Sequence, residues 1–172
     1  DIGGQEMFAR EMAKHLVQKG HQIDVITGAL ANFRLALTEQ YRVGQFEIID
    51  GARIFRVGRR GFPQAYLVRM LRQLLKLDRE QNYDLIHSVG ENIPALVGSL
   101  AKLVRKKPHL VTIQGGILQF GLRPGLKQSM LRLVFGWGLK RADWVHTISQ
   151  HLANGATKLG AKRISVIPNG ID

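Results

Sequence analysis

The spacing of hydrophobic residues changes along the first third of the chain between helical and extended patterns. Residues 5–19 carry apolar side chains three and four positions apart, which predicts an amphipathic helix. Residues 22–27 alternate between polar and apolar side chains and are rich in β-branched types, as in a strand. Two further apolar runs, 46–49 and 53–57, flank Asp50-Gly51, so we expect a hairpin there.

From residue 63 onward, helical and strand patterns alternate regularly. The expected strands are short and nearly continuously apolar, which is typical of parallel strands that crossover helices bury on both faces. The sequence therefore predicts one α/β domain over residues 1–172, with a doubly wound, mostly parallel, Rossmann-like sheet. The expected helices are 63–81, 93–107, 127–141 and 150–159, and the expected strands are 84–88, 109–113, 144–148 and 163–167.

The composition agrees with a globular domain and excludes several classes of protein. Hydrophobic side chains make up 45% of the 172 residues, enough to bury a core. No apolar run approaches the roughly 20 residues that a membrane-spanning helix needs. Because the sequence has no cysteine, disulfides, thiolate metal sites and a cysteine nucleophile are excluded, and we expect a reducing, cytoplasmic compartment.

The net charge of +12 is concentrated in two stretches without acidic residues, 51–77 and 92–142. Such stretches indicate a polyanionic partner: nucleic acid, a phosphorylated ligand or an anionic membrane surface. A surface that is cationic without a specific partner explains the charge as well. The arginines lack the interleaved aromatic residues of an RNA-binding surface, so nucleic acid is not expected. The sharpest basic group comprises Arg59, Arg60, Arg69, Arg72 and Lys76.

Gly3-Gly4 comes directly before the first predicted helix. Two glycines allow a ligand to approach the backbone closely, and the free N–H groups of a helix N-terminus attract anions. A plain tight turn explains the pair equally well. The sequence has neither a G-x-G-x-x-G fingerprint nor a Walker P-loop, so the usual dinucleotide and nucleoside triphosphate motifs are absent.

Several short motifs together resemble the N-terminal, acceptor-side domain of glycosyltransferase family 4, which has the GT-B fold. They follow the order and spacing of that family and cover essentially the whole chain. The motifs are Gly3-Gly4-x-Glu6, Lys19-Gly20-His21-x-Ile23, Asp84-Leu85-Ile86-His87, Val111 to Gly116, Arg141 to Val145 leading to Ile148-Ser149, and Ile164 to Asp172.

This resemblance implies an enzyme with two Rossmann-like domains that face each other across a cleft. Such enzymes move a sugar, commonly a hexose, from a nucleotide-sugar donor to an acceptor with retention of anomeric configuration. No cofactor or metal ion is expected. A lipid-linked or cell-envelope glycan acceptor is expected, together with peripheral contact between the cytoplasmic enzyme and an anionic membrane.

The resemblance also assigns candidate site residues. Gly3 and Gly4 would approach the donor's diphosphate or its sugar, and Gly115 and Gly116 would allow close backbone approach at the cleft. Gln114 stands where many relatives carry a histidine that contacts the donor sugar. An amide donates and accepts hydrogen bonds but does not titrate. Gln114 is equally well explained as a polar residue that caps the following loop.

Candidate acceptor contacts are Glu91 and Asn92, which follow the predicted strand 84–88, and the basic pair Arg59 and Arg60. Asn92 is also a plausible N-cap for the next helix. His87 lies within the strand, so we expect it to be packed and hydrogen-bonded rather than to act as a base. The resemblance places Asn169 and Gly170 at the interdomain junction, where they would serve as a hinge. No residue is assigned as a catalyst.

The resemblance further predicts that the family's first strand and its C-terminal, donor-binding domain are missing from these 172 residues. The first strand of a doubly wound sheet is central, and its loss leaves buried backbone groups unpaired at roughly 1–3 kcal/mol each. We therefore expect a segment of a longer protein that neither folds alone nor catalyses transfer alone.

Three alternatives remain open: another GT-B enzyme such as a nucleotide-sugar epimerase, a basic module that docks on an anionic membrane or nucleic acid, and a nicotinamide-dependent enzyme, which would lack its glycine fingerprint. Finally, Leu126, Met130, Leu133 and Trp137 form a stripe at helical spacing. We expect this stripe to pack into the core rather than to anchor the protein in a membrane.

Overall fold

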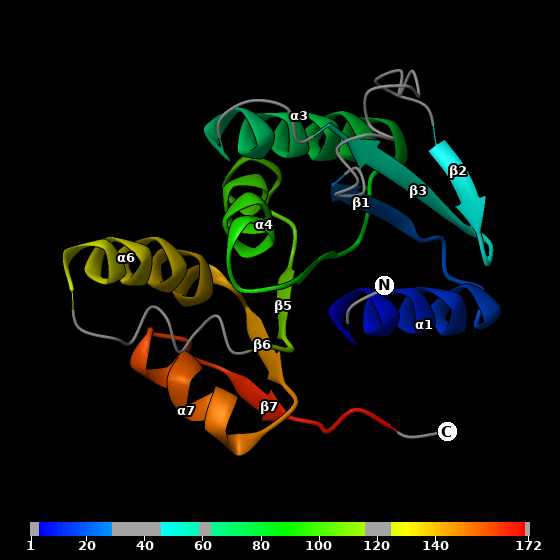
Figure 1. Ribbon diagram of the computed structural model, residues 1–172. Helices are drawn as coiled ribbons and strands as arrows, with labels where there is room; N and C mark the ends of the chain where they lie inside the picture. Colours follow the sequence, from blue (N-terminus) through cyan, green and yellow to red (C-terminus); the bar gives the residue numbers. More distant parts are fainter. Residues whose placement is uncertain (1–3, 29–45, 59–62, 116–124, 171–172) are drawn as a thin grey trace, which may run out of the picture. The chain divides into compact units, whose positions relative to one another are not determined.

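The computed structural model describes residues 4–28, 46–58, 63–115 and 125–170 (Figure 1). The chain divides into two compact units. One unit comprises Met7–Glu80, and the other comprises Asp1–Glu6 with Gln81–Asp172. The first helix, α1 (Gly4–Gln18), begins in the second of these units and continues into the first. We call them the three-stranded unit and the four-stranded unit, after their sheets.

The three-stranded unit contains β1 (Asp24–Gly28), β2 (Phe46–Ile49) and β3 (Ala52–Val57), in the order β1-β3-β2. β1 pairs with β3 in parallel, and β2 pairs with β3 in antiparallel. Asp24 and Arg53 stand opposite each other across the parallel pair, and the Arg53 Nε lies 2.7 Å from the Asp24 Oδ1. Because the Asp24 side chain is only 3% exposed, this ion pair compensates a buried carboxylate.

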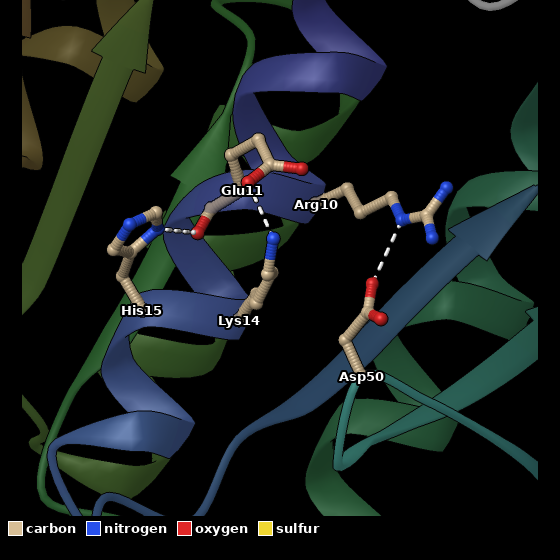
Figure 2. Close-up of polar contacts among 5 residues, drawn as sticks. All are labelled: Arg10, Glu11, Lys14, His15 and Asp50. Atoms are coloured by element: carbon tan, nitrogen blue, oxygen red, sulfur yellow. Dashed lines mark hydrogen bonds and ion pairs between the residues drawn. The ribbon is translucent and has the colours of Figure 1, made fainter. Parts of the chain in front are cut away.

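The hairpin predicted around Asp50-Gly51 is confirmed. Both turn residues have positive φ, 51° for Asp50 and 84° for Gly51, as a two-residue type I′ turn requires. Figure 2 shows Arg10 of α1 reaching this turn, where its Nε donates to the Asp50 Oδ2 over 2.8 Å. That hydrogen bond lowers the pKa of Asp50. A side chain at Gly51 would meet Val17 Cγ1 at 2.6 Å, so only glycine fits against α1.

The predicted helix over residues 63–81 is α3 (Pro63–Gln81). Its apolar stripe faces inward, with Met70 and Leu77 buried. The cations of this helix lie on its solvent side, since Arg69, Arg72, Lys76 and Arg79 are all exposed. The outward surface of α3 therefore carries four cations, together with the exposed Val68 and Glu80.

The four-stranded unit contains a parallel sheet in the order β4-β5-β6-β7 (Figure 1). Crossover helices connect its strands, as the alternating pattern predicts. The strands are β4 (Ile86–Val89), β5 (His109–Ile113), β6 (Trp144–Thr147) and β7 (Ile164–Val166). The helices are α4 (Ile93–Arg105), α6 (Leu126–Arg141) and α7 (Gln150–Lys158).

The described strands thus form two sheets rather than one. β1 is the outermost strand of the first sheet and β4 the outermost strand of the second. Within the described part of the chain, each of these two strands pairs on one side only. The expectation that the family's first, central strand is missing from these residues stays a prediction.

Helices α4, α6 and α7 pack on the same apolar face of the four-stranded sheet. Val111, Ile113 and Val145 supply the strand side of this core. The helices supply residues that are 7% exposed or less, such as Ala95, Leu139 and Ala156. Within the described residues, no helix has both the length and the apolar character needed to cross a bilayer.

The expectation that the stripe of α6 packs into the core is wrong for two of its members. Met130 is 64% exposed and Leu133 is 74% exposed, whereas Phe135 and Leu139 of the same helix are buried. The two sets lie on different sides of the helix, because α6 has apolar residues on more than one side. The predicted stripe does have helical spacing, but the sheet is covered by another apolar side of α6, which contains Phe135 and Leu139.

His109 joins the sheet to two helices from the interior of the core. Its Nε2 lies 2.9 Å from Ser88 Oγ of β4, and its Nδ1 lies 3.4 Å from Ser99 Oγ of α4. The Ser88 hydroxyl donates to the Pro94 carbonyl over 2.8 Å, so its oxygen accepts from the imidazole. The Ser99 hydroxyl donates to the Gly138 carbonyl of α6 over 2.8 Å. Both serine hydroxyls are thus used on backbone carbonyls, so a neutral imidazole can donate to only one of the two serine oxygens, and Nε2 makes the shorter contact.

Gly98 of α4 makes room for this histidine, which gives a first testable prediction. A Cβ at Gly98 would overlap the imidazole and come within 2.5 Å of Ser88 Oγ. We expect Gly98→Ala to lower the free energy of unfolding by about 3 kcal/mol, because the core must be overpacked. Chemical denaturation measures this change.

Gly138→Ala is the matched control, since its nearest neighbour would be a backbone atom of Ala95 at 3.4 Å. We expect that variant to change the stability by less than about 1 kcal/mol. Helix propensity alone predicts that alanine stabilises both positions by about 1 kcal/mol. A Gly98→Ala protein as stable as the parent would contradict the packing argument.

Candidate functional site

The carboxyl ends of β4 and β5 lie side by side, because the two strands are parallel and neighbouring. After β4 the chain turns at Gly90, which has φ 115° and donates its N–H to the Thr112 carbonyl over 2.8 Å. The first turn of α1 reaches the same place, since a Cβ at Gly90 would lie 2.6 Å from Gln5 Nε2. This edge of the sheet therefore gathers segments from three distant parts of the sequence.

Glu91 and Asn92, the predicted acceptor contacts, lie at this edge directly before α4. Glu91 is only 2% exposed, so its carboxylate is buried next to the N-terminus of a helix, where partial positive charge favours an anion. Asn92 occupies the N-cap position of α4, but its side chain makes no capping hydrogen bond. Asn92 therefore stands at the N-cap position, but capping does not explain why an amide side chain is present there.

Gln114 and Asn169 face each other across this edge of the sheet through their side-chain amides. Gln114 Nε2 donates to Asn169 Oδ1 over 3.2 Å, and Asn169 Nδ2 donates to Gln114 Oε1 over 3.1 Å. The pair joins the end of β5 to the segment after β7, 55 positions further along the chain. The structure thus brings together a predicted donor contact and a predicted hinge residue.

Gly4 and Gly115 stand in open space. A Cβ built on either residue meets no atom of the described chain within 4 Å, and neither residue has a positive φ. Gly4 begins α1, and Gly115 follows Gln114. Among the described residues, nothing requires glycine at these two positions, in contrast to Gly98. A Cβ at Gly170, the second predicted hinge residue, also meets no atom of the described chain within 4 Å. The remaining predicted site residues, Gly3, Gly116, Arg59 and Arg60, lie outside the described residues.

A row of polar side chains crosses the sheet face that lies opposite the apolar core. His87 Nε2 lies 2.8 Å from Thr112 Oγ1, which lies 3.2 Å from His146 Nδ1. His146 Nε2 lies 2.9 Å from the Ile167 carbonyl, which only accepts. When Nε2 donates to this carbonyl, Nδ1 is left to accept from the Thr112 hydroxyl, whose oxygen accepts from His87 Nε2. His87 is thus hydrogen-bonded within the sheet, as we expected.

Sequence reasoning missed Thr112, His146 and the core residue His109. The sequence feature that could have revealed Thr112 and His146 is their position on two strands predicted to be adjacent and parallel. In the structure these two residues are direct register partners. Within the described segments, no group of three His, Asp or Glu side chains is arranged to hold a metal ion.

The two buried histidines give a pH-dependent prediction. Burial lowers the pKa of both His87 and His109 to about 4, from an ordinary value of 6.5. Lys102 acts in the same direction on His109, and His146 on His87. The unfolded chain then binds protons below pH 6.5 that the folded chain rejects down to pH 4. Stability is therefore complete above pH 6.5 and falls as the pH drops, by about 2 kcal/mol per histidine at pH 5.

Denaturant titrations at pH 7 and pH 5 measure this loss. His87→Gln keeps an amide within reach of Thr112 and removes one of the two titrating groups. We expect that variant to lose about half as much stability between the two pH values as the parent loses. An equal loss in both proteins would show that His87 is not kept neutral by the fold.

The Gln114–Asn169 pair predicts a measurable coupling between two distant residues. A double-mutant cycle with Gln114→Ala and Asn169→Ala should give a coupling of about 0.5–1 kcal/mol, since two solvent-exposed hydrogen bonds are lost together. The exposed contact between Gln150 and Asn154, a single hydrogen bond within α7, is the control. Its coupling should be about 0.3 kcal/mol. Additive effects at positions 114 and 169 would contradict the pairing.

The fold is that of a Rossmann-like half of a GT-B protein. HepE from Anabaena, solved in complex with UDP, matches the structure with a TM-score of 0.63 at 20% sequence identity. The match covers 100% of this chain and 42% of the HepE chain, so this sequence spans less than half the length of that protein. A search of curated proteins found no match.

The family follows from a separate comparison. The family model described as Glycosyltransferase Family 4 matches residues 2–172, which is essentially the whole sequence. The chain therefore belongs to glycosyltransferase family 4, as its motifs indicate.

Proposed function

We propose that these residues form the acceptor side of a retaining glycosyltransferase that uses a nucleotide-sugar donor. In the proposed reaction the bond between the sugar C1 and the diphosphate oxygen breaks, and a bond from C1 to the acceptor oxygen forms. The proton of the acceptor hydroxyl passes to the departing diphosphate oxygen, and the nucleoside diphosphate leaves. The carboxyl ends of β4 and β5 are where a ligand of a parallel α/β sheet is expected to bind.

The observation that carries the proposal is the open space around Gly4 and Gly115. Crowding or a positive φ requires glycine at Gly51, Gly90 and Gly98, but within the described structure neither reason applies at Gly4 or Gly115. A ligand that lies against the backbone supplies the missing reason. The N–H groups at the start of α1 favour an anionic group, such as a diphosphate, beside Gly4.

The other site residues have distinct proposed roles. Gln114 offers hydrogen bonds to sugar hydroxyl groups, and Glu91 and Asn92 belong to the acceptor side. Gly3, Gly116, Arg59 and Arg60 keep their proposed donor or acceptor roles on the strength of the motifs alone. Asn169 and Gly170 connect this domain to a second, donor-binding domain. Because the second domain would bind most of the donor, residues 1–172 alone are proposed to have no transferase activity. No metal or cofactor is proposed to take part.

The acceptor is proposed to be a lipid-linked or cell-envelope glycan. The exposed cations of α3 support a cytoplasmic enzyme that contacts an anionic membrane, because cationic side chains near such a surface gain favourable electrostatic energy. UDP sugars are the first donors to test, since HepE was solved with UDP.

The proposal predicts what alanine does at the two open glycines. In the protein as its gene encodes it, Gly4→Ala and Gly115→Ala should leave the melting temperature unchanged. Each should weaken the binding of UDP, GDP or ADP sugars about tenfold, or about 1.4 kcal/mol, because the new methyl group occupies the ligand's position. Calorimetric titration measures the affinity, and transfer of labelled sugar measures the activity.

Gly58→Ala is the control, since the described structure leaves open space there as well. We expect it to change neither stability nor affinity. Product analysis should show transfer with the donor's anomeric configuration retained. Epimerised nucleotide sugar as the product, or unchanged donor affinity in both site variants, would overturn the proposal.

A further inference from the structure

The sequence contains two Asn-Gly dipeptides, Asn154-Gly155 and Asn169-Gly170. In such a dipeptide the backbone nitrogen of the glycine can attack the side-chain carbonyl carbon of the asparagine. Glycine favours this attack, because it has no side chain in the way and its backbone turns freely. The reaction still requires that the local backbone can leave its resting conformation. The two dipeptides therefore present the same covalent chemistry in two structural settings.

The first dipeptide lies inside helix α7. Gly155 is buried, and its carbonyl accepts from the Leu159 N–H over 3.2 Å. The Asn154 side chain is held as well, because its Oδ1 accepts from Gln150 Nε2 over 3.0 Å. An attack on Asn154 therefore requires that this turn of the helix opens and that Gly155 leaves its buried place, which costs the free energy of a local unfolding. We expect the helix to suppress the reaction.

The second dipeptide lies after β7, in a segment that has neither helix nor strand, and both of its residues are exposed. Among the described residues, the backbone bonds that tie this segment to the sheet end with the Ile167 N–H, which donates to the Thr147 carbonyl over 2.9 Å. Gly170 has no positive φ, and a Cβ there meets no described atom within 4 Å. The backbone at Asn169 can therefore rearrange without the loss of regular structure.

A side-chain contact restrains Asn169 in another way. Its Oδ1 accepts from Gln114 Nε2 over 3.2 Å, and its Nδ2 donates to Gln114 Oε1 over 3.1 Å. Both bonds need a planar carboxamide, and the attack makes Cγ tetrahedral, so the two bonds do not both survive it. Because the contact is exposed, it should slow the attack by only about two- to fivefold, or about 0.5–1 kcal/mol.

We propose that Asn169 is a site of deamidation and that its contact with Gln114 slows the reaction. The Gly170 nitrogen forms a bond to Asn169 Cγ, and its proton goes to the departing Nδ2. The bond between Cγ and Nδ2 breaks, so that ammonia leaves and a succinimide ring remains. Water, the single co-reactant, then opens the ring at one of its two carbonyls and gives aspartate or isoaspartate. The proposal does not depend on transferase activity.

The conversion changes the edge of the sheet that carries the candidate site. Each product replaces the amide of residue 169 by a carboxylate, which adds a negative charge and only accepts hydrogen bonds. The bond that Asn169 Nδ2 donates to Gln114 is therefore lost. In the isoaspartate product the main chain also runs through the former side chain, so one carbon is added to the backbone before Gly170. The predicted hinge is thus where the chain would become longer.

Mass spectrometry of peptides tests the proposal with the protein as its gene encodes it. The folded protein is incubated at neutral pH, and conversion at positions 154 and 169 is followed over time in the same sample. We expect conversion at Asn169 to be at least about tenfold faster than at Asn154, a difference in barrier of at least about 1.4 kcal/mol. In denaturant the two positions should convert at similar rates, because the helix and the side-chain contact are then lost.

Two substitutions separate the chemistry from the restraint. Gly170→Ala should slow conversion at Asn169 by at least about tenfold, because the added methyl group hinders the attacking nitrogen. Gln114→Ala should speed it by about two- to fivefold. Gln150→Ala is the matched control, because it also removes an amide partner of an asparagine but leaves that asparagine in a helix. It should leave the rate at position 169 unchanged and Asn154 protected.

Thermal melting checks that the three variants remain folded. Any of four results would overturn the proposal: no conversion at Asn169 in the folded protein, equal conversion at Asn154, an unchanged rate in Gly170→Ala, or a rate in Gln114→Ala no faster than in the parent. A difference between the two positions that persists in denaturant would overturn it as well, since the fold would then not be its cause.

Discussion

The hydrogen bonds of His109 hold together the unit that carries the candidate site. The imidazole lies fully buried between β4 and α4, and its neutral form satisfies the Ser88 oxygen while the two serine hydroxyls bind backbone carbonyls of α4 and α6. The backbone of the same residue is tied as well, since its N–H donates to the Asp143 carboxylate and its carbonyl accepts from the Asp143 N–H, each over 2.9 Å. A buried polar network of this kind is stable only when nearly all its members are paired. These bonds therefore tie strand β5 to β4 and to α4.

That fixed position determines where the site forms. Parallel pairing places the ends of β4 and β5 at one edge, and the turn at Gly90 is bonded to Thr112 of the neighbouring strand. Gln114 follows two residues after Thr112, so its direction is set by the same strand. The polar row that starts at His87 continues to the Ile167 carbonyl, two residues before Asn169. The elements that present the site are thus held by bonds within the sheet rather than by loops.

Local patterns predicted most of the elements because local forces determine them. The apolar spacing of 63–81 and the Asp50-Gly51 dipeptide gave the helix and the turn that the structure has. Strand β4 begins at Ile86 rather than at the predicted residue 84, and ends at Val89 before the positive φ of Gly90. The exposure of Leu133 could not be predicted, because α6 carries two apolar sides and spacing does not say which of them meets the sheet. The pairing of Gln114 with Asn169 could not be predicted either, since 55 residues separate them and neither side chain has a local reason to bond.

The amide pair at positions 114 and 169 also has a symmetry. If both side chains turn over by half a rotation together, each donor becomes an acceptor and both hydrogen bonds re-form. Gln114 can therefore turn either its second N–H or its second carbonyl lone pair toward the open side without losing its contact to Asn169. A hydroxyl group can also donate or accept a hydrogen bond. With the backbone fixed, Gln114 can therefore bind a hydroxyl that donates as well as one that accepts. A charged histidine or a carboxylate at position 114 would fix one polarity.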